Sequence, residues 1–192
     1  YYQMKTSLPS ALGNTDLIKE VMPFWYTLKI TAGQVVITDL YSPANPSVPM
    51  AEPLTAIRNS GYKIIPTITD GTAKLVLAKF LATPANRTKT VAAILNLVNA
   101  NGFDGIDLDF ENFAFLDGNT SWPSTKPNWV LFVNELATAL HANQKILSVT
   151  TPYLLDPATG KQGYYVYAWA DISPVIDRLR IMTYDYSVAK PG

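Results

Sequence analysis

The sequence predicts an α/β fold built on a parallel sheet, and three observations lead to that expectation. Apolar and aromatic runs of strand length recur along the chain, amphipathic stretches of helical period separate several of them, and 48% of the 192 residues are hydrophobic. This length and content suit one domain, over residues 1–192, with a sizeable core. Alternating strands and helices are typical of βαβ units, in either an open doubly wound sheet or a (β/α)8 barrel, and periodicity alone does not choose between the two.

The predicted strands are short runs of apolar, aromatic and β-branched residues. In chain order they are 21–28, 62–69, 103–111, 145–151 and 178–184.

Two stretches between these runs have apolar residues at helical spacing. Residues 88–102 end in Gly102, a residue that often follows a helix, and residues 126–143 have Pro127 near the expected first turn. Segments 112–128 and 155–163 are rich in Gly, Ser, Thr, Pro and Asn, so we expect both to be loops, the first directly after the strand at 103–111.

Composition excludes several classes of function. Fifteen basic residues balance fifteen acidic ones, so we expect neither a nucleic-acid partner nor attraction to anionic membranes. No apolar run approaches the roughly 20 residues that cross a bilayer, so we expect no membrane insertion. The chain has no cysteine and a single histidine, His141, so carboxylates must do any proton transfer. Nothing in the sequence calls for a cofactor or a metal.

The most informative stretch is FDGIDLDFENF at 103–113. Because side chains alternate along a strand, Asp107, Asp109 and Glu111 share one face, about 6 to 7 Å apart, while the apolar residues between them share the other. Like charges at that spacing, partly shielded from water, raise at least one pKa and favour a shared proton. A general acid with a raised pKa beside an ionised carboxylate is what glycosidic cleavage requires.

Two other interpretations of this row remain open. The carboxylates can form the solvated face of a half-exposed strand, as in an antiparallel sheet. Closely spaced carboxylates can also hold Mg²⁺ or Ca²⁺.

The segment Asp104-Gly105-Ile106-Asp107-Leu108-Asp109-Phe110-Glu111 resembles the DGxDxDxE signature on the fourth barrel strand of glycoside hydrolase family 18, the chitinase family. Met182-Thr183-Tyr184-Asp185-Tyr186 is similar to that family's MxYD stretch on the sixth strand, and 145–152 (KILSVTTP) is similar to its fifth. The run at 23–26 (PFWY) looks nearer to the branch with bacterial spore-germination and cell-wall hydrolases. At 67–71 the chain has TITDG where many members have SxGG, a departure that concerns glycan fit more than chemistry.

The resemblance implies a (β/α)8 barrel and retaining hydrolysis assisted by the substrate. Glu111 then protonates the glycosidic oxygen, Asp109 orients the N-acetyl group that attacks the anomeric carbon, and Asp107 shares a proton with Asp109. Tyr184 donates a hydrogen bond to the N-acetyl oxygen, and Asp104, on the opposite strand face, is structural. The expected substrate contacts are Asp185, Met182, Tyr2, Phe24 and Tyr26.

A complete barrel has eight strands and about 250 residues. Only six candidates are present if Tyr1-Tyr2 is the remnant of the first. We therefore expect an incomplete barrel whose last strands come from the same or another chain, because an open arc leaves unpaired strand edges.

The predicted function is hydrolysis of β-1,4 linkages next to N-acetylglucosamine in chitin-like oligosaccharides or peptidoglycan glycan strands. The substrate class implies an extracellular or cell-envelope location. The alternative is a catalytically inactive, chitinase-like carbohydrate-binding protein or a subunit of a surface assembly. Relatives of that kind commonly lose the final acid of the signature, and Glu111 is present.

Overall fold

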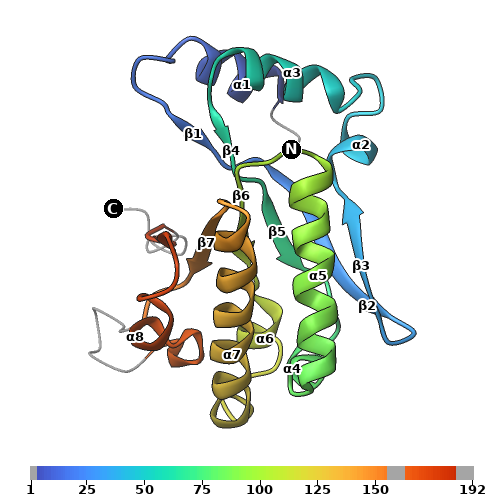
Figure 1. The fold of residues 1–192 in the computed structure, drawn as a ribbon, viewed down its shortest axis with the longest axis vertical. Coiled ribbons are helices and arrows are strands. Elements are labelled where there is room, and N and C mark those ends of the chain that lie inside the picture. The colour runs from blue at the N-terminus through green and yellow to red at the C-terminus, as the bar shows by residue number, and fades with distance from the viewer. Residues whose placement is uncertain (1–3, 155–162, 185–192) are drawn as a thin grey trace, which may run out of the picture.

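The computed structural model describes residues 4–154 and 163–184, which form an α/β arrangement (Figure 1). In chain order its elements are α1 (Met4–Leu12), β1 (Glu20–Val21), β2 (Phe24–Thr31), β3 (Gln34–Asp39), α2 (Tyr41–Ala44), α3 (Ala51–Asn59), β4 (Lys63–Ile64), β5 (Thr67–Asp70), α4 (Val76–Leu81), α5 (Pro84–Ala100), β6 (Gly105–Asp109), α6 (Asn112–Phe115), α7 (Trp122–Ala142), β7 (Ile146–Thr151), the 3₁₀ helix η1 (Tyr165–Tyr167), α8 (Trp169–Ile172) and β8 (Arg178–Ile181).

The strand order of the main sheet favours the barrel over the doubly wound sheet. Its order is β3-β2-β5-β6-β7-β8, with β3 antiparallel to β2 and every other neighbouring pair parallel. The parallel strands therefore lie in chain order, without the reversal that creates the crevice of a doubly wound sheet. Consecutive addition of strands is the pattern of a (β/α)8 barrel. Within the described residues the sheet does not close.

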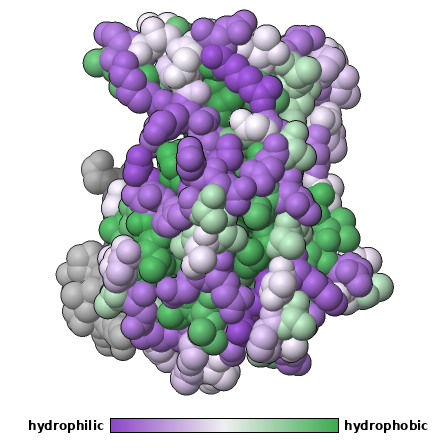
Figure 2. Space-filling model, in the orientation of Figure 1, coloured by the Kyte–Doolittle hydropathy of each residue, from purple (hydrophilic) through white to green (hydrophobic). Residues whose placement is uncertain are grey.

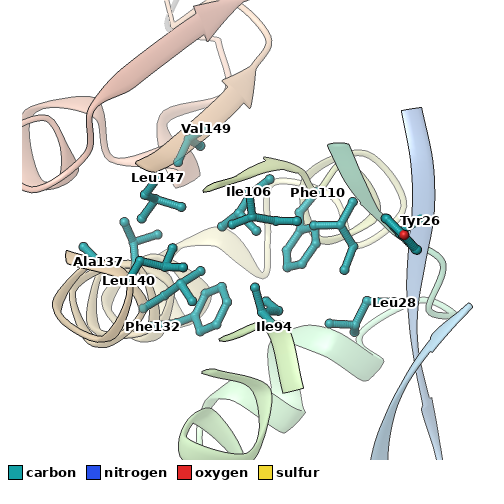
Figure 3. Packing of buried hydrophobic residues seen from close by; sticks show 14 of the residues in the cluster. Tyr26, Leu28, Ile94, Ile106, Phe110, Phe132, Ala137, Leu140, Leu147 and Val149 are labelled. Atoms are coloured by element: carbon teal, nitrogen blue, oxygen red, sulfur yellow. The ribbon is translucent and has the colours of Figure 1, made fainter. Parts of the chain in front are cut away.

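The long helices cover one face of this sheet. Figure 1 shows α5 and α7 side by side in front of the strands, with the β2–β3 hairpin extending past them. The apolar face of β6 points toward these helices, and Ile106, Leu108 and Phe110 are completely buried. Phe110 stacks on Phe132 of α7 with ring centroids 6.2 Å apart, and Figure 3 shows both with Ile94 of α5 in the same cluster. The carboxylate face of β6 is therefore the one that the helices leave open.

All five predicted strand regions contain a strand. The apolar residues Ile68, Ile106, Leu108, Leu147 and Val149 of β5, β6 and β7 are buried, whereas the residues of β8 are partly or largely exposed. The predicted loop at 112–128 is wrong over much of its length: α6 begins at Asn112 and α7 at Trp122, leaving only residues 116–121 between them. Pro123 lies in the first turn of α7, where its missing N–H is tolerated, and Trp122 is buried. The polar composition concealed a helix start.

Three features beside the sheet were not anticipated. β1 and β4 form a separate parallel pair, the β2–β3 hairpin has an antiparallel edge, and α1 and α3 lie together at the end of the molecule where β1 and β4 meet (Figure 1). No helix among the described residues has the length and hydropathy of a membrane span. Figure 2 shows that the face carrying α5 and α7 is mostly polar, with apolar residues in small groups.

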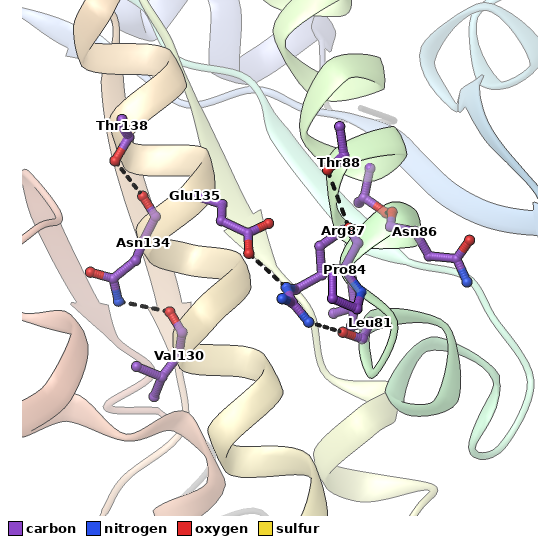
Figure 4. Close-up of polar contacts among 10 residues, drawn as sticks. Leu81, Pro84, Asn86, Arg87, Thr88, Val130, Asn134, Glu135 and Thr138 are labelled. Atoms are coloured by element: carbon purple, nitrogen blue, oxygen red, sulfur yellow. Dashed lines mark hydrogen bonds and ion pairs between the residues drawn. The ribbon is translucent and has the colours of Figure 1, made fainter.

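An ion pair joins α5 to α7. Arg87, buried, donates from Nε to Glu135 Oε1 at 2.8 Å and from Nη1 to the carbonyl of Leu81 at 3.0 Å (Figure 4). The Glu135 side chain is 37% exposed, so water screens part of the interaction.

We expect Glu135→Ala to lower the free energy of unfolding by about 1 to 2 kcal/mol, since a buried guanidinium then keeps only its carbonyl acceptor. Urea denaturation measures the change. Glu135→Gln, which retains an acceptor oxygen, is the matched control and should lose less. Equal stability of the alanine variant and the parent would mean that helix packing alone holds Arg87.

Candidate active site

Asp107 is the most enclosed member of the acidic row. Its side chain is completely buried, and the neighbouring strands supply hydroxyl groups: Thr67 of β5 donates at 2.9 Å, Ser148 of β7 at 2.6 Å and Thr150 of β7 at 3.1 Å. Arg180 of β8 donates from Nη1 to Asp107 Oδ2 at 2.7 Å. Asp107 accepts in every one of these contacts, which is the bonding pattern of a carboxylate.

Asp109 lies one step further along β6 and has far fewer partners. It pairs in register with Thr69 of β5, and its Oδ1 is a buried atom without a hydrogen bond among the described residues. Burial, then the charges of Glu111 and Asp107, raise the pKa of Asp109 to about 7, and the Arg180 cation opposes part of that rise. Asp109 therefore keeps its proton to a higher pH than an ordinary aspartate does.

Glu111 follows the end of β6, at the residue where α6 begins. Its backbone is in the right-handed helical region, so the side chain leaves the strand at the carboxyl end of the sheet. The side chain is partly buried, and burial raises its pKa above the usual glutamate value. Tyr167 of η1 donates its hydroxyl to the carbonyl of Phe110 at 2.7 Å, which fixes the backbone beside Glu111.

The first two residues of the acidic signature hold β6 in place. Asp104 accepts the N–H of Ile64 on its carboxylate at 2.8 Å, and its own carbonyl accepts the N–H of Ile146 at 2.8 Å. A Cβ at Gly105 would lie 2.2 Å from the carbonyl oxygen of Ile146, so only glycine fits. Both residues connect β6 to its neighbours, as expected for Asp104 from its strand face.

The other predicted site residues lie at the ends of neighbouring strands or outside the described residues. Met182 follows β8 and its N–H donates to the carbonyl of Thr151 at 2.9 Å, while Tyr184 is 64% exposed. Phe24 starts β2 and is 37% exposed. Tyr2 and Asp185 lie outside the described residues.

Tyr26 lies on the helix side of β2, in the hydrophobic core (Figure 3). Its ring centroid is 6.1 Å from that of Phe103, and it is only 5% exposed. This placement does not favour the expected contact with a substrate.

Sequence reasoning missed an aromatic group beside Glu111. Tyr164 is surrounded by three rings, with centroid distances of 4.8 Å to Phe115, 5.5 Å to Tyr153 and 5.5 Å to Trp122. Burial raises the pKa of Tyr164, and the charges of Tyr153 and Glu111 raise it further. Phe115 belongs to α6, the helix that follows Glu111, and is 42% exposed. Phe115 and Trp122 lie in the predicted loop at 112–128, which the structure shows to contain α6 and the start of α7.

The row offers proton chemistry from carboxyl groups. A hydrogen-bonded carboxylate, a neighbour with a raised pKa and a partly buried acid lie in that order toward the carboxyl end of β6, where barrel active sites lie. Among the described residues, no group of three or more His, Cys, Asp or Glu side chains is arranged to hold a metal ion. Donor groups from three separate strands, β5, β7 and β8, hold the Asp107 carboxylate.

Comparison with known proteins gives concordant matches. The model of "Glycosyl hydrolases family 18" matches residues 2–191. Chitinase A1 of Niallia circulans is 32% identical over 112 residues, which are 56% of this chain and 16% of that protein.

Two solved structures share the fold. The second catalytic domain of the group II chitinase of Ostrinia furnacalis, a mutant in complex with penta-N-acetylchitooctaose, has a TM-score of 0.69 at 21% identity, over 92% of this chain and 46% of that one. The spore cortex-lytic enzyme SleL of Bacillus megaterium has a TM-score of 0.69 at 14% identity, over 94% of this chain and 39% of that one. The chain thus spans less than half of either structure.

Proposed function

The chain belongs to glycosyl hydrolase family 18, and from that premise we propose that it carries the catalytic row of a retaining, substrate-assisted enzyme. The proposed reaction cleaves the β-1,4 linkage next to an N-acetylglucosamine residue. One observation carries the proposal: Asp109 and Glu111, partly buried and with raised pKa values, follow the hydrogen-bonded Asp107 toward the carboxyl end of β6. A carboxyl group whose pKa is raised by burial, beside another carboxyl group, is what glycosidic cleavage requires.

In the proposed first step, the proton of Glu111 passes to the glycosidic oxygen as that oxygen leaves. Burial raises the pKa of Glu111, so the side chain retains its proton closer to neutral pH than an exposed glutamate does. Meanwhile the N-acetyl oxygen of the same substrate attacks the anomeric carbon and forms an oxazolinium ion. Glu111, now ionised, then takes a proton from water as that water opens the oxazolinium, which restores the acid and retains the anomeric configuration.

Asp109 is assigned the N-acetyl group. Its unpartnered Oδ1 is free to accept the amide N–H of the substrate, and its carboxylate form stabilises the positive charge of the oxazolinium. Asp107 supplies the fixed negative charge beside it. Tyr184 is proposed to donate to the N-acetyl oxygen.

Substrate contacts are proposed on both sides of the row. Met182 and Phe24 come from the ends of β8 and β2, and Asp185 and Tyr2 complete the set by resemblance. Phe115, exposed beside Tyr164, adds an aromatic face of the kind that packs against sugar rings. Tyr26 is left out of this set because the core encloses it.

The proposed substrates are chitin-like oligosaccharides or the glycan strands of peptidoglycan. The likeness to chitinase A1 supports the first, and the likeness to a spore cortex-lytic enzyme supports the second. Either substrate implies an extracellular or cell-envelope location. The rest of the barrel, from the same or another chain, is the proposed partner of the open sheet.

The direct test is product analysis with the full-length protein on N-acetylglucosamine oligomers and on peptidoglycan in parallel. We expect turnover of at least one, with products whose anomeric configuration, read by proton NMR within the first minutes, is that of the cleaved bond. Products of inverted configuration would exclude substrate assistance. Binding of either glycan without turnover would favour the carbohydrate-binding alternative.

A further inference from the structure

Arg180 is a charged residue that neither the acidic signature nor the MxYD stretch assigns. It lies on β8, in register with Thr150 of β7, which itself donates to Asp107. The guanidinium therefore reaches across β7 to a carboxylate two strands away and meets it at 2.7 Å. This side chain bridges the edge strand and the centre of the catalytic row.

The second arginine of β8 has a different partner. Arg178, two residues earlier and so on the same strand face, donates from Nη2 to Glu20 Oε1 at 2.8 Å. Both arginines are about half exposed, at 43% for Arg178 and 45% for Arg180. One strand thus presents two similar cations, of which only Arg180 contacts the row.

Both carboxylate oxygens of Asp107 accept hydrogen bonds from neighbouring strands. Oδ2 accepts from Arg180, Thr67 and Thr150, and Oδ1 accepts from Ser148 and Thr150. The three hydroxyl groups can turn to accept a proton, but the Arg180 guanidinium can only donate, so its contact at 2.7 Å with Oδ2 favours the ionised form of Asp107. Asp109 has no comparable set of donors, and its Oδ1 has none among the described residues.

We infer that Arg180 is a positioning residue: it fixes the negative charge of the row on Asp107 and so leaves the mobile proton of the row to Asp109. This inference rests on the proposed function for its catalytic meaning, but the placement of the proton can be tested without turnover. It also refines the expectation that Asp107 and Asp109 share a proton, since the sharing becomes unequal.

The charged and titratable groups around Asp109 come from three directions. Asp107 and Glu111 flank it along the chain, and Arg180 faces it from β8. The charge of Asp109 is also one of the causes that raise the pKa of Tyr167 in η1. Around Asp107, β5 and β7 contribute hydroxyls and β8 contributes the guanidinium. Removing the one cation favours the protonated form of each neighbouring carboxyl, so the pKa of Asp109 rises.

The experiment is a carbon-13 NMR titration of side-chain carboxyls in the full-length protein labelled on aspartate, with Asp109 assigned from the Asp109→Asn spectrum. We expect Arg180→Gln to raise the pKa of Asp109 by about 0.5 to 1 unit, and Arg180→Lys, which keeps the charge, to stay nearer the parent. Arg178→Gln is the matched control, because it removes a cation from the same strand face without touching the row. Its Asp109 pKa should stay close to that of the parent.

Two results would overturn the inference: an unchanged pKa of Asp109 in Arg180→Gln, or an equal rise in Arg178→Gln. If Arg180→Gln does not fold, Arg180→Met, which also removes the charge from a side chain of similar length, takes its place, and an unchanged pKa of Asp109 in that variant would overturn the inference in the same way. Where the enzyme turns over, the acid-side limb of kcat/KM should also move to higher pH in Arg180→Gln. A shifted titration without any turnover would uphold the inference and reject the proposed function.

Discussion

Replacing Glu111 with Gln is expected to lower kcat by about 10² or more, because the amide cannot protonate the leaving oxygen. The change keeps size and hydrogen-bonding capacity, and Glu111 is only partly buried, so the fold and glycan binding should persist. Single-turnover kinetics on the better substrate, with the dissociation constant measured separately, resolves chemistry from binding. The expected pattern is a large loss in rate with a change in affinity of a few-fold at most.

Glu52→Gln is the matched control for this experiment. Glu52 is an exposed residue of α3, so the same substitution there tests for general effects of removing one carboxylate. If Glu111→Gln retained more than a third of the parent rate, another carboxyl of the row would have to be the acid. The role proposed for Asp109 would then also change, because it depends on Glu111 being the acid.

Each of the five predicted strand regions contains a strand, because local chemistry favours one there, whereas β3 lies outside the predicted regions. In β6 the alternation of Ile106 and Leu108 with Asp107 and Asp109 specifies which face meets α5 and α7. The same alternation in β7 puts Ser148 and Thr150 on the face of the carboxylates. Because strand alternation along KILSVTT places Ser148 and Thr150 on one face, the sequence alone was sufficient to predict these two donors.

Other parts of the site had no local signal. The partner of Arg180 depends on β8 lying beside β7 in a particular register, which a residue pattern does not encode. The burial of Tyr26 depends on a shift in register near the start of β2, so that its strand face cannot be counted from a simple alternation. Where α7 starts depends on Trp122 reaching the carbonyl of Ala114 with its Nε1 at 3.2 Å, a tertiary contact inside a polar segment.

Asp109→Asn is expected to lower kcat by about 10² while stabilising the folded protein at neutral and higher pH. The loss of rate follows from the loss of the charge that supports the oxazolinium. The gain in stability follows from burial, which raises the pKa of Asp109 to about 7 in the folded state, above its value near 3.9 when unfolded. Ionised Asp109 therefore costs folding free energy, and asparagine removes that cost. Parallel measurements of turnover and urea denaturation detect the two effects.

The pH dependence distinguishes this explanation from simple repacking. Below about pH 4 Asp109 is protonated in both the folded and the unfolded state, so the variant and the parent should have similar free energies of unfolding. Between about pH 4 and 7 Asp109 ionises in the unfolded chain before it does so in the folded protein, and the stability advantage of the asparagine variant grows. Above about pH 7 this advantage becomes constant, at about 1 to 2 kcal/mol after allowing for partial exposure to water. Asp16→Asn, at an exposed residue outside the helices and strands, should stay within about 0.5 kcal/mol of the parent. A gain for Asp109→Asn that was the same at pH 4 and pH 8 would come from packing, and the raised pKa of the row would lose its main support. A gain that follows this pH course would mean that the fold gives up stability to keep an aspartate beside Glu111, which is reasonable only where that carboxyl has chemistry to perform.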